Sequence, residues 1–275
     1  RSRACVALTA FAVVVLPLYG TVVFRTRRPG AHALRGVCIV FANTFLFLGL
    51  AALPIADAVA VFFVSPLVIT VFSVLFLREQ VGARRWSAVA VGFAGVLLIV
   101  KPGTSAFQLA TLFPMLAATL YAVMHIVTRR IGGTESAATM AVYSQLTFLV
   151  VSILIGLAIG DGKFAGRVHP DLYFLVRQWG PVAPDDYWVF GLLGVSGLMG
   201  VLSISQAYRL SEAAFAAPFE YVAMPMAILW GVTIFATWPD RVAWAGIVLI
   251  IGSGLYLVWR ESRKGKAAGA GPVRR

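Results

Sequence analysis

The feature that most constrains this chain is a series of apolar segments, each about 16–24 residues long, separated by connections that are short except for the one at 160–186. An α-helix rises about 1.5 Å per residue, so segments of this length match the roughly 30 Å hydrocarbon core of a bilayer. Lipid offers backbone groups no hydrogen-bond partner, and each segment is therefore predicted to be a helix. The nine segments cover residues 4–24, 36–53, 55–77, 86–101, 106–128, 138–159, 187–208, 213–236 and 241–259.

The charged residues are too few for a soluble globule. They make up 12% of the 275 residues, against roughly 25% in soluble domains, while 60% of the residues are hydrophobic. The net charge of +12 sits in short clusters between apolar segments, without a basic stripe interleaved with aromatic residues. This pattern gives no indication of nucleic-acid binding. We expect an all-α, polytopic membrane bundle that has the lipid bilayer as its solvent.

The basic residues indicate how the chain is oriented. They gather at one set of segment ends, which we expect to be the cytoplasmic side of a plasma (inner) membrane, with the C-terminus inside and the 160–186 connection outside. The chain opens with Arg1 rather than Met, at the edge of an apolar segment, so we expect an upstream helix and ten spans in the intact protein. The residues of the basic side are Arg25, Arg27, Arg28, Arg35, Arg78, Arg84, Arg85, Arg129, Arg130, Arg209 and the tail from Arg260.

The chain aligns with itself at a shift of about 157–159 positions. "LPIADAVAVFFVSPLV" (53–68) lies against "LSEAAFAAPFEYVAMP" (210–225), and further along Trp86 meets Trp244 and Gly95 meets Gly254. Five spans per half is an odd number, so the two repeats are predicted to be inverted relative to each other. We place the first repeat, lacking its first helix, at 1–103 and the second at 104–262. A basic cytoplasmic tail that we expect to be disordered follows at 263–275.

The quoted segments resemble the EamA-type branch of the drug/metabolite transporter (DMT) superfamily. The resemblance also includes "FLREQVGARRWSAVAVGFAGVLLIVKPG", "LYAVMHIVTRRIGG" and "AGIVLIIGSGLYLVWRE", and it covers nearly the whole chain. It implies ten helices in two inverted repeats, a central cavity, and transport of small metabolites by alternating access. The chain departs from the family in its missing first helix. Its second repeat also has Thr237 and Asp240 near the place where the first has Glu79, which argues against a matched pair of gates.

Glu220 is the most unusual residue inside an apolar segment. A carboxylate within a membrane costs a few kcal/mol on insertion scales, so it usually faces a cavity or a partner. Pro218 and Pro225 flank it, and Pro66 interrupts the aligned segment of the first repeat. Interrupted helices at matching positions are the best sequence indication of a transporter's binding site. We expect Glu220 to bind substrate or carry a coupling proton, with a structural, paired carboxylate as the alternative.

Tyr121 and His125 lie one helical turn apart on segment 106–128. His125 is interpreted either as a neutral side chain satisfied by a carbonyl or as a proton-sensitive site residue. Tyr221, beside Glu220, is suited to stacking on a flat ligand, and core or lipid-facing packing explains it equally well.

Three amide side chains, Asn43, Gln145 and Gln206, lie on three other segments. Hydrogen bonds between helices explain such amides at about 0.6–2 kcal/mol each, and contact with substrate is the alternative.

The sequence favours a secondary transporter for a small organic metabolite or drug-like solute. It contains no phosphate-binding motif of the form GxxxxGK[ST], and it indicates no cofactor, catalytic residue or metal site. His32, His125 and His169 are too scattered to suggest a membrane-embedded enzyme, and a non-transporting receptor or assembly protein is the other alternative. Proton coupling and a homodimer are compatible with the sequence, which decides neither.

Overall fold

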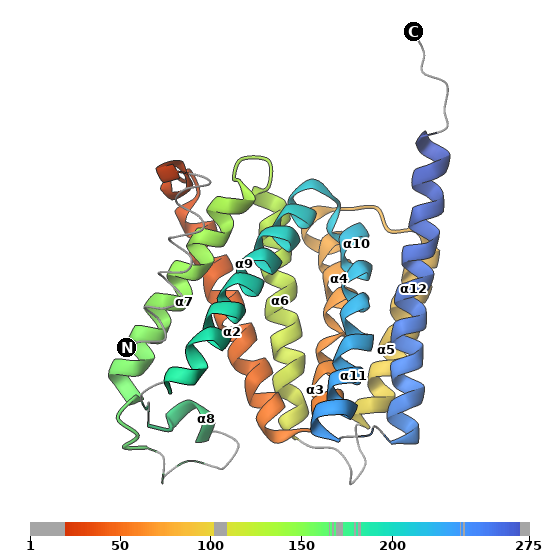
Figure 1. Ribbon diagram of the computed structural model, residues 1–275. Coiled ribbons are helices and arrows are strands. Elements are labelled where there is room, and N and C mark those ends of the chain that lie inside the picture. The colour runs from red at the N-terminus through yellow and green to blue at the C-terminus, as the bar shows by residue number, and fades with distance from the viewer. Residues whose placement is uncertain are drawn as a thin grey trace. The chain divides into compact units, whose positions relative to one another are not determined.

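The computed structural model describes residues 20–101, 109–164, 173–178, 183–236 and 240–269, with the single residues 166, 168, 180 and 238. Every regular element in these ranges is a helix (Figure 1). Six helical segments among the described residues are long and apolar enough to cross a membrane. These are Pro29–Ala52, Asp57–Leu77, Ala83–Val100, Leu109–Ile131, Ala137–Ile159 and Pro184–Leu210. The all-helical membrane class is confirmed, while a count of nine spans stays a prediction.

The helices have the following bounds in chain order. They are η1 (Gly20–Phe24), α2 (Pro29–Ala52), α3 (Ile55–Phe62), α4 (Ser65–Leu77), α5 (Ala83–Val100), η2 (Leu109–Thr111), α6 (Leu112–Ile131), α7 (Ala137–Ile159), α8 (Tyr173–Val176), η4 (Pro184–Asp186), α9 (Tyr187–Leu210), α10 (Ala213–Ala216), η5 (Ala217–Val222), α11 (Ala223–Phe235) and α12 (Arg241–Gly269).

Several helices differ from the segments expected from sequence. The expected segment 4–24 lies largely outside the described residues, and its described end forms the 3₁₀ helix η1. Helix α2 begins at Pro29 rather than at residue 36. The expected segments 55–77 and 213–236 are each interrupted, the first between α3 and α4 and the second by the 3₁₀ helix η5. A proline near each interruption explains it locally, because proline lacks the N–H that an α-helix needs.

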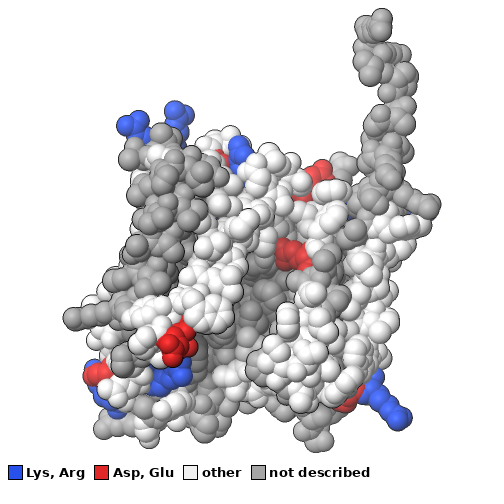
Figure 2. All heavy atoms as spheres, viewed as in Figure 1, with Lys and Arg blue, Asp and Glu red and all other residues white. Residues whose placement is uncertain are grey.

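The chain forms two compact units, which we describe separately. Unit 1 comprises Arg1–Thr44 and Val123–Ser211, and unit 2 comprises Phe45–Ala122 and Glu212–Arg275. Each unit therefore contains residues from both halves of the sequence. On the face shown in Figure 2, the described Lys and Arg side chains lie at helix ends, and the surface along the helices is mostly uncharged. That distribution is expected for helices surrounded by lipid.

Unit 2 is built on an antiparallel crossing of α5 and α12. A Cβ added to Gly95 would lie 2.6 Å from the Gly246 carbonyl oxygen, and one added to Gly246 would lie 2.5 Å from the Gly95 carbonyl oxygen. Only glycine allows two backbones to approach this closely. Beside this crossing, α3 packs against α11, and α4 packs against α10 and η5.

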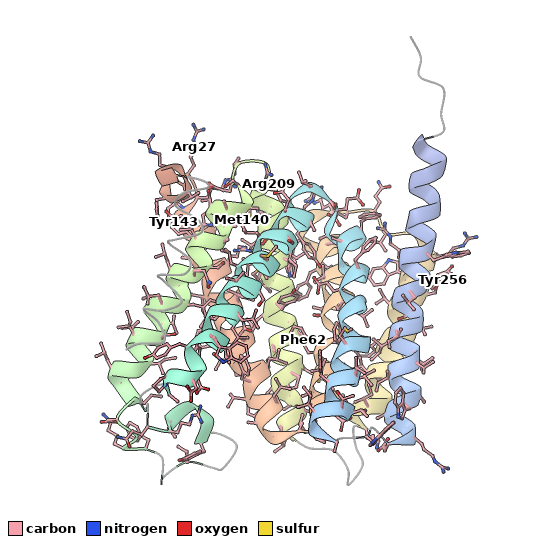
Figure 3. The ribbon with its side chains drawn as sticks, viewed as in Figure 1. Arg27, Phe62, Met140, Tyr143, Arg209 and Tyr256 are labelled. Carbon is pink, nitrogen blue, oxygen red and sulfur yellow. The ribbon has the colours of Figure 1, made fainter. Side chains whose placement is uncertain are left out.

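Unit 1 contains the first part of α2, the end of α6, and helices α7 and α9. Its buried apolar cluster includes Val142 of α7 and Leu198 of α9. Figure 3 shows Met140 and Tyr143 on α7 towards the end of unit 1 that also holds Arg27 and Arg209. The basic side chains of this unit that are labelled in the figure thus lie at a common end, as the charge pattern predicts.

Candidate functional site

The interruption between α3 and α4 leaves polar groups without their usual hydrogen-bond partners in the buried part of unit 2. The N–H groups of Leu67 and Val68 both donate to the Val64 carbonyl, at 3.0 and 3.1 Å. Pro66 has no N–H, so the Phe62 carbonyl loses its usual helical donor. The Ser65 hydroxyl is completely buried and makes no hydrogen bond to any residue that the structure describes. An unsatisfied buried hydroxyl costs about 1–3 kcal/mol of stability, so the interruption locally destabilises the apolar core.

Glu220 lies in η5, the second interruption, where its side chain is half-buried. Helix η5 packs against α4 and α12 within unit 2. Pro218 lies in the same 3₁₀ helix, and Pro225 is the third residue of α11, which continues through it. A proline in the first turn removes only an N–H that has no helical partner, so Pro225 does not interrupt α11. The side chains of both prolines lie outside the described residues.

An aromatic pair lies close to the first interruption. The rings of Phe62 and Tyr121 meet edge to face, with centroids 5.3 Å apart, and both side chains are half-buried. Figure 3 labels Phe62 among the helices of unit 2. The Tyr221 side chain, a further candidate for stacking, lies outside the part of the chain that the structure describes.

His125 belongs to unit 1 and is 1% exposed. Its ring lies against that of Tyr208 on α9, with centroids 3.8 Å apart. This contact packs α6 against α9. Whether His125 is a neutral side chain satisfied by a carbonyl or a proton-sensitive site residue stays a prediction.

The three amides of unit 1 differ in their surroundings. Asn43 Nδ2 donates to the Ile39 carbonyl of its own helix, at 3.0 Å, so this bond does not join two helices. Gln206 is exposed, and its Oε1 accepts a bond from Arg209 Nη1 at 3.1 Å. Gln145 is half-buried on α7. Their part in substrate binding stays a prediction.

Arg35 corrects the sequence interpretation most clearly. The charge pattern predicts Arg35 among the basic residues at the membrane surface, but it lies in the second turn of α2 and is 3% exposed. Its guanidinium donates from Nε to Thr128 Oγ1 at 2.7 Å and from Nη2 to Ser205 Oγ at 2.7 Å. From Nη1 it donates to the Met140 carbonyl at 2.8 Å and to Ser144 Oγ at 2.5 Å. A buried arginine costs about 2.5–3.5 kcal/mol on insertion scales, and bonds of this number offset that cost.

A second buried cluster lies next to the start of α2. Glu135 accepts hydrogen bonds from Thr26 Oγ1 at 3.0 Å and from the Arg27 N–H at 3.1 Å. His32 Nε2 lies 3.3 Å from its other oxygen. Burial raises the pKa of Glu135, but the bonds from Thr26, Arg27 and His32 outweigh burial and hold this pKa below its usual value. The cluster fastens the chain before α2 to the turn between α6 and α7.

The predicted site residues are divided between the two units. Glu220, Tyr121, Tyr221 and the three prolines belong to unit 2, and His125 and the three amides belong to unit 1. Sequence analysis missed Arg35 and Ser65. One feature of the sequence could have indicated that Arg35 lies within a helix: it stands six residues after Pro29 and directly before an apolar run. Among the described residues there is no group of three or more His, Cys, Asp or Glu side chains that could hold a metal ion.

Comparison with known proteins places the chain in a family. Residues 3–101 match the EamA-like transporter family. The chain is 30% identical to a riboflavin transporter of Vibrio cholerae, covering 95% of this chain and 84% of the relative. It is 30% identical to a riboflavin transporter of Rhizobium johnstonii, with 92% and 78% covered. It is also 27% identical to an S-adenosylmethionine uptake transporter of Rickettsia prowazekii, with 92% and 80% covered.

The fold is also known from crystallography. A solved crystal structure matches with a TM-score of 0.66, covering 95% of this chain and 88% of the other at 18% identity. At that identity the likeness concerns the fold alone. The relatives named above carry the family assignment, because they extend over most of both chains. The chain therefore belongs to the EamA-like transporter family of the DMT superfamily, and it is a multi-pass membrane transporter rather than an enzyme.

Proposed function

We propose that this protein is a secondary transporter that takes up a small metabolite with a flat heterocyclic ring, by alternating access through a cavity between two inverted repeats. The observation that carries the proposal is the pair of interrupted helices in unit 2. A shift of 157 positions places Phe63 on Glu220, so the two interruptions occupy matching places in the repeats. Transporter sites are typically formed by such helices, since the freed backbone groups bind substrate or ions.

The packing of unit 2 supports the inverted repeat. Gly92 faces Ser253 and Gly95 faces Ile250, each with 3.0 Å between the added Cβ and the nearest atom of that side chain. Trp86 of α5 aligns with Trp244 of α12, so these two helices occupy matching places in the repeats. A two-fold axis between inverted repeats would pair such helices antiparallel, as α5 and α12 are paired here. We retain 1–103 and 104–262 as the two repeats and 263–275 as the tail.

The substrate class follows from the relatives and from the aromatic pair. Riboflavin contains a three-ring isoalloxazine and S-adenosylmethionine contains an adenine, so both substrates named for the relatives present a flat ring with polar edges. Phe62 and Tyr121 offer ring surface beside the interruption at Ser65, where an opening of the helices would present the buried hydroxyl and the freed Phe62 carbonyl to a ligand. Stacking on such rings contributes about 1–3 kcal/mol per base in nucleic-acid binding, and we expect a similar contribution here.

Uptake into proteoliposomes tests the proposal. We expect radiolabelled riboflavin or S-adenosylmethionine to accumulate at a rate about tenfold or more above that in protein-free liposomes, since uptake relies on a protein site. Unlabelled flat heterocycles should compete for uptake, and a sugar of similar size should not. Transport that sugars inhibit and heterocycles leave unchanged would refute the substrate class, while no transport of any solute would refute the function.

The orientation is tested by labelling cysteines. In an inverted repeat, the connections after α4 and after α11 lie on opposite sides of the membrane. In a variant that lacks both native cysteines, we expect Trp238→Cys and Gly166→Cys to react with an impermeant maleimide in intact cells, and Gln80→Cys and Gly269→Cys to react only after lysis. Equal labelling of the Gln80 and Trp238 positions would contradict the inversion.

A further inference from the structure

We infer that Arg35 is a releasable clamp, a positioning residue that joins two pairs of helices within unit 1. Its guanidinium lies on α2 and donates to Thr128 of α6, to Met140 and Ser144 of α7, and to Ser205 of α9. One side chain therefore links four helices at a single buried point. The inference concerns the movement of helices and goes beyond the proposed function. It can be tested without any substrate.

Helices α2 and α7 form one pair. The rings of His32 and Tyr143 stack with their centroids 4.6 Å apart. One turn further along α2, Gly36 packs so closely on Thr147 that an added Cβ would lie 2.1 Å from the Thr147 hydroxyl oxygen. These contacts hold α2 to α7 independently of Arg35.

Helices α6 and α9 form the second pair. The rings of His125 and Tyr208 lie 3.8 Å apart. At the end of this pair, Arg209 Nε donates to the Gly132 carbonyl at 3.0 Å, and Arg129 Nη1 donates to the Arg209 carbonyl at 3.2 Å. These contacts hold α6 to α9, again independently of Arg35.

Between the pairs lie apolar contacts and the bonds of Arg35. Val142 of α7 and Leu198 of α9 share an apolar cluster. Apolar contacts are non-directional and allow helices to slide, whereas hydrogen bonds fix one arrangement. The turn between α6 and α7 and the Glu135 cluster join the pairs at one end, and the bonds from Arg35 to Thr128 and Ser205 fix how the α2–α7 pair sits on the α6–α9 pair deeper in the helices.

Two of the hydroxyl partners do not depend on Arg35. Thr128 Oγ1 also donates to the Met124 carbonyl at 2.8 Å, and Ser144 Oγ donates to the Met140 carbonyl at 3.0 Å. When Arg35 leaves, each of these hydroxyls keeps a bond within its own helix. Release therefore leaves neither hydroxyl without a hydrogen bond, which lowers the free-energy cost of opening the clamp.

The native thiol of Cys38 provides a reporter for the clamp. Cys38 lies on α2, three residues after Arg35, and is 4% exposed. With Cys5 changed to Ser it is the single cysteine of the chain. A buried thiol reacts with N-ethylmaleimide in proportion to the fraction of time its surroundings are open. A second protein, carrying Ser73→Cys in place of Cys38, reports on unit 2, where Ser73 is completely buried.

The test compares Arg35→Lys with Arg28→Lys in both reporter proteins. Lysine keeps the charge of arginine but replaces the planar fork with one point donor, which cannot reach acceptors on three helices. We expect Arg35→Lys to increase alkylation of Cys38 by about tenfold at temperatures well below Tm, with alkylation at position 73 unchanged. Arg28 is exposed at the start of α2, so Arg28→Lys should change neither rate.

Ser205→Ala keeps the test informative if Arg35→Lys does not fold. It removes one acceptor of the clamp, and we expect alkylation of Cys38 to increase by about two- to fourfold. Equal increases at Cys38 and at position 73 would show that Arg35 only stabilises the whole fold and would overturn the inference. So would alkylation of Cys38 that stays within twofold of the parent in both variants.

Discussion

Glu220→Gln is expected to reduce transport by about tenfold or more, which corresponds to roughly 1.4 kcal/mol of lost stabilisation. Glutamine keeps the shape of the side chain and removes its charge, so the change separates an electrostatic role from packing. Glu220 is half-buried in η5, where the helix is interrupted, and an ionisable side chain within a membrane-spanning segment usually serves transport. We expect Tm and membrane levels close to the parent, and a flattened pH dependence of transport because glutamine does not titrate.

The matched control for this experiment is Glu212→Gln. Glu212 immediately precedes α10, its side chain is 55% exposed, and it lies 4.0 Å from Arg85. Exposed ion pairs contribute about 0–1 kcal/mol, so this variant should transport as the parent does. If the Glu220 variant matches the parent at every pH, the carboxylate is structural and the coupling site lies elsewhere. If both variants lose transport equally, net charge rather than position explains the loss.

Gly246→Ala should destabilise the protein by about 1–3 kcal/mol, the usual cost of overpacking. The added methyl would lie 2.5 Å from the Gly95 carbonyl oxygen, and a backbone atom cannot move aside without separating α5 from α12. Without a hydrophobic force between helices in lipid, the close approach of these two backbones is a main source of their association. The measurement is Tm of the purified protein in lipid or detergent.

The control for this change lies on the same helix. Gly252 of α12 has open space around the position of an added Cβ. Alanine is the better helix former by about 1 kcal/mol, so Gly252→Ala should leave Tm unchanged or raise it. Equal effects at the two positions would show that helix propensity, rather than the crossing of α5 and α12, governs the result.

Much of the helical structure can be predicted from local sequence, as two segments show. Segment 55–77 was recognised as a membrane helix by its length and apolarity, and Pro66 drew attention to the region where α3 ends and α4 begins. Segment 213–236 is predicted to be a membrane helix for the same reasons, and the structure divides it into α10, η5 and α11, with Pro218 in η5. That this segment spans the membrane stays a prediction. Both inferences need only nearby residues, since proline removes an N–H wherever it stands. Whether these two interruptions form the binding site stays a prediction.

Arg35 shows what local sequence could not provide. Its neighbours in sequence predict a surface arginine, because a charged residue at the edge of an apolar run is usually solvated. The acceptors that make its burial favourable lie on α6, α7 and α9, between 93 and 170 positions away along the chain. The free energy of a buried charge depends on those distant hydroxyls, and no local pattern encodes their arrangement.

The sequence by itself determined the solvent, the all-helical class and the prolines near both interruptions, because each follows from the length, apolarity and backbone chemistry of a continuous segment. Only the tertiary structure decided that Arg35 is buried, that His125 packs on Tyr208, and that Gly95 and Gly246 meet at their backbones. These outcomes depend on which helix faces lie against each other. In lipid that choice is made by close packing and by hydrogen bonds between helices rather than by apolarity, which all the helices share.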